Sequence, residues 1–237
     1  MRPGTSKSAS WIKALSTVHQ GTAFEERSLA LLHKSMSMSL KRVGGKEDGG
    51  IDLLGWWWLP AIHNSSLNHD IATNRRRIRV IGQCKAEKKK LGPKFVRELE
   101  GVLFRFLTNP LDKPPDPEFT NPDTSQLPIV ALLMSESEFT KSAILRANSS
   151  PIPFFLLHLP AIDNSDDTTE DDGLGEMGMA LCNPALCGTD GLLKGNMELR
   201  WERRGLGGAG RGRPALWWGN QKLHSWTPEL VTPSKVM

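Results

Sequence analysis

The stretch Val80-Ile81-Gly82-Gln83-Cys84-Lys85 ends a predicted β-strand that begins at Arg77. Side chains two apart on a strand share a face, so Gln83 and Lys85 project together beside Ile81. Burying an amide and an ammonium beside an apolar side chain is expensive unless they meet a metal ion, a carboxylate or a substrate. This strand is therefore expected to carry the function of the protein.

A second stretch, Gly49-Gly50-Ile51-Asp52-Leu53-Leu54, is a glycine-rich turn that leads into an apolar strand. If the two strands pair as a hairpin, Asp52 meets Gln83 and Lys85 at one end. A carboxylate and an amide oxygen can hold a divalent metal ion, and an ammonium can orient or deprotonate water and offset phosphate charge. The three groups therefore suit hydrolysis of a phosphodiester.

An aspartate followed by a later Gln-x-Lys resembles the PD-(D/E)xK nuclease signature in the form found in Mrr-type restriction endonucleases. The segments Gly21 to Glu25 and Leu91 to Gly101 resemble the helices that flank that signature. The sequence is similar to a fungal mitochondrial "required for respiratory growth" family that carries such a domain. This similarity is found around Gly49 to Gly55, Gln83 to Lys85 and Val96 to Gly101. The resemblance spans roughly residues 20 to 225.

This resemblance implies a restriction-endonuclease-like fold and a Mg²⁺- or Mn²⁺-dependent nuclease that acts on mitochondrial nucleic acid, with DNA favoured over RNA. Asp52 and Gln83 would ligate the metal, the Cys84 backbone carbonyl would complete the sphere, and Lys85 would assist the attacking water. Gln83 replaces the usual acidic residue, which should weaken metal affinity. The alternative is a non-catalytic nucleic-acid-binding or maintenance factor that keeps the nuclease fold.

Glu25 has two interpretations. In the nuclease fold a glutamate of the first helix can approach the metal, which makes Glu25 a further candidate for the site. Thr22 and Glu25 also have the spacing of a capping box, which predicts a helix start at this point and explains Glu25 without chemistry.

The net charge of +4 is modest but unevenly placed. Basic residues gather next to the expected site, and nucleic-acid contacts are expected from Lys88, Lys89, Lys90, Lys94 and Arg97. For any single cluster the simpler interpretation is a solvated surface.

The three cysteines form no disulfide framework, and their spacing disfavours zinc. No apolar run has the length of a membrane span.

Four parts are expected along the chain, and the oligomeric state is left open. Residues 1–20 are basic and lack acids, as in a mitochondrial presequence, so a matrix location is expected. Residues 21–162 form the restriction-endonuclease-like domain, an α/β fold with a mixed central sheet of about five strands flanked by helices. Residues 163–176 are an acidic flexible loop, and residues 177–237 are a C-terminal β extension with a tail.

Overall fold

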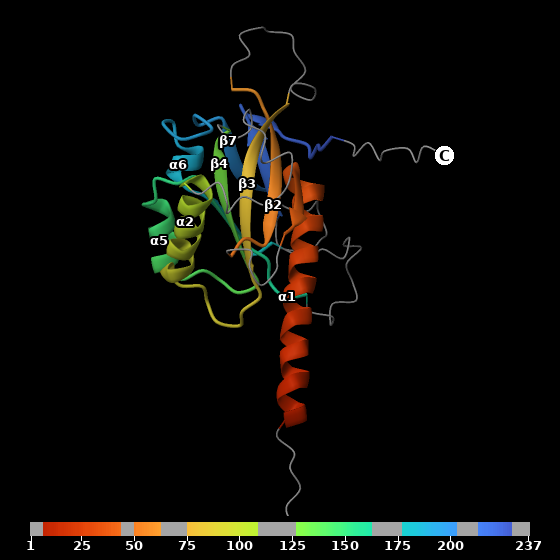
Figure 1. The fold of residues 1–237 in the computed structure, drawn as a ribbon. Helices are drawn as coiled ribbons and strands as arrows, with labels where there is room; N and C mark the ends of the chain where they lie inside the picture. Colours follow the sequence, from red (N-terminus) through yellow and green to blue (C-terminus); the bar gives the residue numbers. More distant parts are fainter. Residues whose placement is uncertain are drawn as a thin grey trace, which may run out of the picture.

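The computed structural model describes residues 7–43, 50–62, 75–108, 127–162, 177–202 and 213–228, with side chains from His19 onward. Within these ranges a six-stranded mixed sheet has helices on both faces, and a smaller three-stranded sheet lies beside it (Figure 1). The acidic stretch 163–176 and residues 1–6 lie outside the described ranges.

The strands of the main sheet follow one another in space in their order along the chain. They are β1 Met38–Arg42, β2 Leu53–Pro60, β3 Arg75–Lys85, β4 Ile129–Ser135, β5 Phe154–His158 and β6 Met179–Cys182. The first three strands pair antiparallel, β3, β4 and β5 pair parallel, and β6 returns antiparallel to β5. The carboxyl ends of β3, β4 and β5 therefore meet at one edge of the sheet.

The helices supply the two covering layers. They are α1 Lys7–Met36, α2 Pro93–Thr108, α5 Lys141–Asn148 and the short α6 Pro184–Cys187. Because α2 connects β3 to β4 and α5 connects β4 to β5, the parallel strands are joined by crossover helices. Among the described helices, none has the length and apolar character needed to cross a membrane.

The second sheet contains β7 Met197–Glu202, β8 Arg213–Trp218 and β9 Gln221–Lys222, which pair antiparallel. β structure therefore occurs within the expected C-terminal extension, although β6, which lies in the same range, belongs to the main sheet. Met197, Leu216 and Trp218 share a buried core with α1 and one face of the main sheet.

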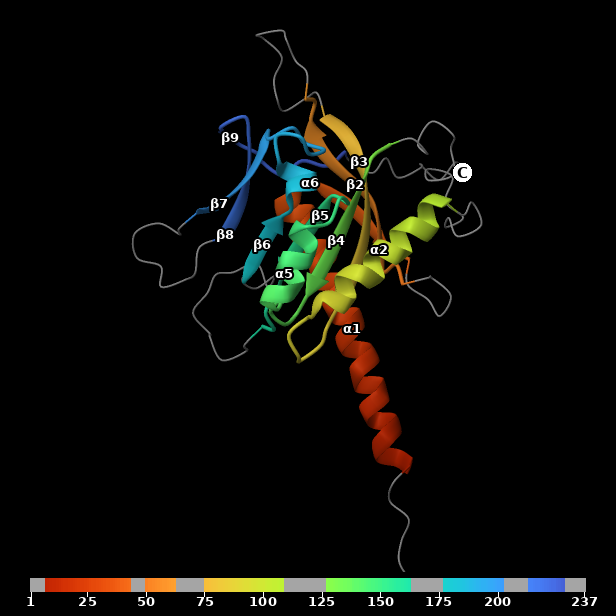
Figure 2. The ribbon, with the colours of Figure 1, turned by 90° about the vertical axis from the view of Figure 1, so that its left-hand side faces the viewer.

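The opposite face of the main sheet is covered by α2 and α5 (Figure 2). In α2 the apolar side chains recur at helical spacing and are buried: Phe95, Val96, Leu99, Val102, Leu103 and Phe106. Ile81 and Leu133 of the sheet belong to the same core. The expected mixed α/β architecture is confirmed.

The first helix begins earlier than Thr22. Because α1 runs from Lys7 to Met36, Thr22 is in the middle of the helix and the expected capping box with Glu25 is wrong. The Ala, Leu and Lys residues on both sides of Gly21 favour helix, so one glycine does not end it. The N-terminal half of α1 projects past the edge of the sheet (Figures 1 and 2).

Asn183, between β6 and α6, ties four parts of the chain together. Its Oδ1 accepts hydrogen bonds from the amides of Phe154 and Leu186, at 2.9 and 3.0 Å. Its Nδ2 donates to the carbonyls of Ala147, Ser150 and Ile152. The side chain is fully buried, so these bonds fix β6 and α6 against β5 and α5.

Candidate metal and phosphodiester site

Asp52 lies directly before β2 and is held by its neighbours on both sides. Its amide donates to the Gly82 carbonyl at 3.0 Å, and its carbonyl accepts from the Val43 amide at 3.0 Å. Its carboxylate Oδ2 accepts a hydrogen bond from the Cys84 amide at 2.7 Å. The carboxylate is thereby fixed against β3 between the positions of Gln83 and Lys85.

Gln83 is buried, with 1% of its surface exposed. Its Oε1 has no hydrogen-bond partner among the residues that the structure describes. Its Nε2 lies 3.6 Å from the position that a Cβ on Gly50 would take. Gly50 has a φ of +90°, a conformation that favours glycine, so the turn before Asp52 brings the backbone against the amide.

Lys85 ends β3 and points to the same face as Gln83. Its Nζ lies 5.7 Å from the centre of the Phe95 ring, in the first turn of α2. The side chain is half-buried. The predicted alternation along β3 is confirmed, since Ile78 and Val80 belong to the α1 core while Ile81 belongs to the α2 core.

The Cys84 thiol points to the α1 side of the sheet. Burial raises the pKa of the Cys84 thiol, and the negative charge of Asp52 raises it further. The nearby Ser28 lowers this pKa, Glu25 raises it and Lys85 lowers it, each by a smaller amount. The charges of Asp52, Glu25 and Lys85 therefore all act on this one thiol near the end of β3.

Glu25 faces this end of the sheet from α1. Its Oε2 accepts a hydrogen bond from Nε of Arg42, at the end of β1, at 2.6 Å. The side chain of Glu25 is 18% exposed and that of Arg42 is 39% exposed. This ion pair gives Glu25 a structural role in joining α1 to β1, and the sequence reasoning missed Arg42 as its partner.

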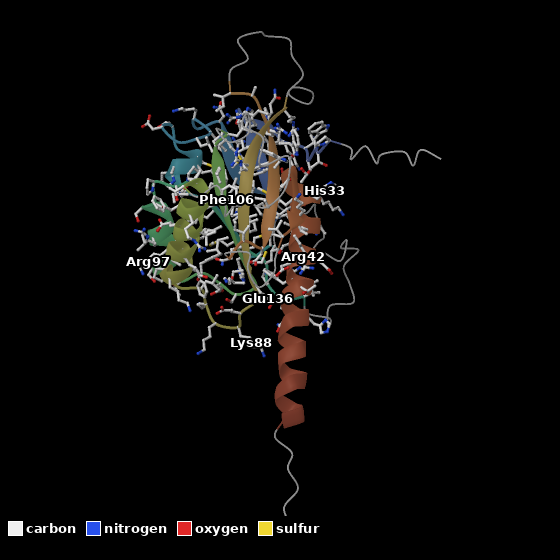
Figure 3. All side chains as sticks on the ribbon, in the orientation of Figure 1. His33, Arg42, Lys88, Arg97, Phe106 and Glu136 are labelled. Atoms are coloured by element: carbon white, nitrogen blue, oxygen red, sulfur yellow. The ribbon has the colours of Figure 1, made fainter. Side chains whose placement is uncertain are left out.

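The five basic residues expected to contact nucleic acid are exposed. Lys88, Lys89 and Lys90 lie in the connection after β3, and Lys94 and Arg97 lie in the first turns of α2. Lys90 pairs with Glu138 at 2.5 Å, and the Nζ of Lys94 lies 4.5 Å from the centre of the Phe95 ring. Lys88 is at the edge of the sheet that Asp52 occupies, whereas Arg97 is on the outer side of α2 (Figure 3).

The same edge carries polar residues that the sequence reasoning did not select. Lys85, Ser135 and His158 are in register across β3, β4 and β5. The Glu136 amide donates to the Lys85 carbonyl at 3.0 Å. Since the carboxyl ends of parallel strands meet at one edge, the position of His158 at the end of an apolar run was the signal that could have found it.

Two oxygen groups at this edge are of the kind that a divalent cation takes. No group of three His, Cys, Asp or Glu side chains suited to a metal occurs within the described ranges, which exclude Glu47 and Asp48. Mg²⁺ commonly takes one or two carboxylates and fills its remaining positions with water and phosphate oxygens. The Asp52 carboxylate and the unpartnered Oε1 of Gln83 meet this requirement.

Fold and site together define a mixed α/β protein whose central strands bring a carboxylate, an amide and an ammonium to one edge of the sheet. Residues 16–184 match the family described as "Required for respiratory growth protein 7", so the chain belongs to that family. The family expected from the sequence motifs is confirmed.

Three relatives illustrate the match. An uncharacterized mitochondrial protein of Schizosaccharomyces pombe is 41% identical over 95 residues, which are 40% of this chain and 34% of that protein. The mitochondrial "Required for respiratory growth protein 7" of Vanderwaltozyma polyspora is 24% identical over 193 residues, covering 68% of this chain and 71% of its own length. The Saccharomyces cerevisiae protein of the same name is 26% identical over 183 residues, covering 65% and 70%.

The match thus covers about a third of the fission-yeast protein and about seven tenths of the other two. The names of these relatives support a mitochondrial location for this chain, and two of them state a requirement for respiratory growth. No solved structure matches the chain.

Proposed function

We propose that this chain is a restriction-endonuclease-like phosphodiesterase that uses Mg²⁺ or Mn²⁺ to cleave nucleic acid in the mitochondrial matrix. DNA is favoured as its substrate, and the role in respiratory growth would be maintenance of the mitochondrial genome. The order of one helix, three antiparallel strands, a crossover helix and a parallel strand is compatible with that fold.

The observation that carries the proposal is the placement of Asp52 on the Cys84 amide, between Gln83 and Lys85. The carboxylate and the unpartnered Gln83 Oε1 would hold the cation, with the Cys84 backbone carbonyl as a third oxygen ligand. The bound cation would neutralise charge on the phosphate and lower the pKa of a bound water. A buried amide oxygen without a partner costs about 1–3 kcal/mol, and a cation ligated by that oxygen would remove this cost.

Lys85 would act on the attacking water and on the phosphate charge. Its ammonium lies over the Phe95 ring, at 5.7 Å from the ring centre, and this attraction favours a position at the edge. The Asp52 carboxylate limits where a phosphate can lie, since phosphate is repelled by the carboxylate and attracted by the ammonium. Exposed Lys88 and Lys89 beside this edge would attract the polyanion.

A second candidate function is a nucleic-acid-binding maintenance factor without catalysis. The observation that favours it is the neutral Gln83, because it adds no negative charge beside Asp52, and the nearby Glu25 is paired with Arg42. A lower charge on the ligands gives a lower affinity for Mg²⁺.

Cleavage of plasmid and of single-stranded substrates in Mg²⁺, Mn²⁺ or EDTA separates the two functions. The enzyme is supported if the wild-type chain cleaves and if Asp52→Ala and Lys85→Ala bind without cleaving. Asp190→Ala and Lys222→Ala, exposed and away from the edge, are the matched controls and should cleave normally. Binding without cleavage by the wild-type chain would favour the second function.

A further inference from the structure

Two cysteines stand on either side of a single helical turn, at the point where β6 leads into α6 (Figure 2). Cys182 is the last residue of β6, and Cys187 is the last residue of the four-residue α6. Asn183 is the N-cap of α6, since its side chain accepts a hydrogen bond from the Leu186 amide at 3.0 Å. Cys182 is therefore the residue before the cap, and Cys187 is the fourth residue of the helix.

These two positions are neighbours in space. A residue just before the cap commonly packs against the fourth helical residue, in the contact known as the hydrophobic staple. The Cys187 amide donates to the Asn183 carbonyl at 3.0 Å, which closes the turn between the two cysteines. Both side chains pack against the same core, the one that α1 and the small sheet share. The two thiols are therefore held together on one side of α6.

The titration of Cys182 agrees with this placement. Burial raises the pKa of the Cys182 thiol, and the neighbouring Cys187 raises it further. For Cys84, the third cysteine of the chain, the charge that raises the pKa most after burial is that of Asp52. Cys182 and Cys187 therefore act on each other, whereas Cys84 belongs to the surroundings of the candidate site.

Both cysteines of the pair are free thiols and are half-buried, so part of each residue contacts solvent. A hydrophobic staple needs two apolar side chains, and aliphatic residues would serve that purpose. Two thiols in contact can in addition become a covalent bond. Because the chemical reactivity of a cysteine usually matters more than its packing, this pair is a candidate for oxidation.

We propose that Cys182 and Cys187 are an oxidisable dithiol, a modification site at which a peroxide joins the end of β6 to α6 through a disulfide. Cys182 stays protonated because its pKa is raised, so Cys187 reacts first. The Cys187 sulfur loses its proton and attacks a peroxide oxygen, the O–O bond breaks, and one water leaves, which gives a sulfenic acid.

The second step forms the disulfide. The Cys182 sulfur gives up its proton and attacks the Cys187 sulfur, the S–O bond breaks, and a second water leaves. The two thiols together lose two electrons and two protons, which reduce the peroxide to water. No further reactant is needed.

The pair is separate from the candidate site. Cys182 pairs with Phe155, whereas the Asp52 edge lies toward His158, three residues or about 10 Å further along β5. The inference is therefore independent of the proposed function. The disulfide would add a covalent link beside the hydrogen bonds of Asn183, and it would restrict the unfolded chain. The oxidised protein should thus have a higher unfolding midpoint than the reduced protein.

The test treats the full chain with hydrogen peroxide, alkylates the remaining thiols and maps the cysteines by mass spectrometry of tryptic peptides. One tryptic peptide holds both cysteines, because no Lys or Arg lies between Arg146 and Lys194. We expect this peptide to be lighter by about two mass units, the mass of two hydrogens, and to regain both thiols in dithiothreitol. Cys84 should be alkylated at the same peroxide concentration.

Three variants test the order of the steps. Cys182→Ser should stop at the sulfenic acid of Cys187, which dimedone labels, because no second thiol is near. Cys187→Ser should take up several-fold less dimedone, and its midpoint should not rise with peroxide. Cys84→Ser is the matched control and should form the disulfide as the wild-type chain does. Stronger dimedone labelling of Cys182 than of Cys187 would contradict Cys187 as the first thiol to react.

The wild-type chain alone decides the main claim, so the test does not depend on whether a variant folds. If peroxide at a concentration that oxidises glutathione leaves Cys182 and Cys187 both alkylated, the dithiol is only a packing contact and the inference is overturned. A disulfide that includes Cys84 would overturn it as well. Either result leaves the proposed function unaffected, since cleavage is measured on the reduced protein.

Discussion

The carboxylate of Asp52 accepts a hydrogen bond from the backbone amide of Cys84, 2.7 Å away. This bond uses a main-chain donor of β3, so it fixes the aspartate at a place defined by the strand rather than by a flexible side chain. Gln83 and Lys85, on either side of Cys84, then share a face beside that carboxylate.

Gln83→Glu should make the site more dependent on a cation. The change places a second carboxylate in a buried position beside Asp52, and like charges destabilise each other without a metal ion. We expect a lower unfolding midpoint in EDTA than for wild type and a larger rise on adding Mg²⁺. A tenfold gain in Mg²⁺ affinity would add about 1.4 kcal/mol to the ligand-induced stabilisation. Thermal unfolding followed by circular dichroism measures both values.

Gln83→Leu is the matched control for that change. It removes the buried amide oxygen, so the midpoint in EDTA should be equal to or above that of wild type. The rise on adding Mg²⁺ should be smaller than for wild type. An Mg²⁺ response that is the same in wild type and both variants would contradict a role for Gln83 as a ligand.

Lowering the pH should destabilise the protein through His158. Burial lowers the pKa of His158 below its ordinary value of 6.5, with smaller opposing effects from the Glu136 backbone and from Glu138. The unfolded chain therefore binds a proton near pH 6.5 that the folded chain resists, and stability is lost as the pH falls below that value. Urea unfolding at neutral and at mildly acidic pH measures the loss. It should be smaller in His158→Gln, and equal losses in the two proteins would show that His158 is not the cause.

Gly55→Ala should prevent β1 from pairing with β2. A Cβ at this position would lie 2.2 Å from the Ser39 carbonyl oxygen and 2.7 Å from the Leu40 Cα, so backbone would have to move. We expect a loss of at least about 3 kcal/mol of unfolding free energy, or no folded protein. Gly101→Ala is the opposite case, because nothing lies within 4 Å of its added Cβ in α2. It should stabilise the protein by about 0.5–1 kcal/mol, and equal effects of the two changes would contradict the register.

Asn183→Ala should cost several kcal/mol although it is outside the candidate site. It leaves the buried amide of Phe154 and the buried carbonyl of Ala147 without their partner, and each such group costs about 1–3 kcal/mol. Chemical denaturation measures the loss. Cleavage per folded molecule should stay as in wild type, so a variant that is stable but inactive would contradict the separation of this region from the site.

The alternating pattern predicted β3 and both of its faces, because one residue of slip would have placed Gln83 and Lys85 in the α1 core. The start of α2 followed from Pro93. The early start of α1 was not predicted, because the spacing of Thr22 and Glu25 imitates a capping box, although helix formers continue through Gly21 without a stop signal. The four-residue β6 has half-buried side chains and no clear alternation, and it exists because β5 offers it an edge.

Of the site, the strand positions of Asp52, Gln83 and Lys85 were predictable from spacing. The partner of Glu25 was not, because Arg42 reaches it from a different element. The ring contacts of Arg77 and Arg79 could not be predicted from the sequence either, since Trp56 and Phe106 come from two other elements. Local patterns indicate faces and strand ends, whereas contacts between elements depend on how the layers pack.

Cleavage of supercoiled plasmid by the wild-type chain and by Asp52→Asn tests the central claim most directly. Both proteins are compared in Mg²⁺ at equal folded concentration, with Asp190→Asn as the control for loss of an exposed carboxylate. We predict cleavage by the wild-type chain and by Asp190→Asn, and a rate at least about a hundredfold lower for Asp52→Asn, since a metal ligand is lost. An Asp52→Asn protein that cleaves at the wild-type rate, or a wild-type chain that cleaves nothing in Mg²⁺ or Mn²⁺, would contradict the account.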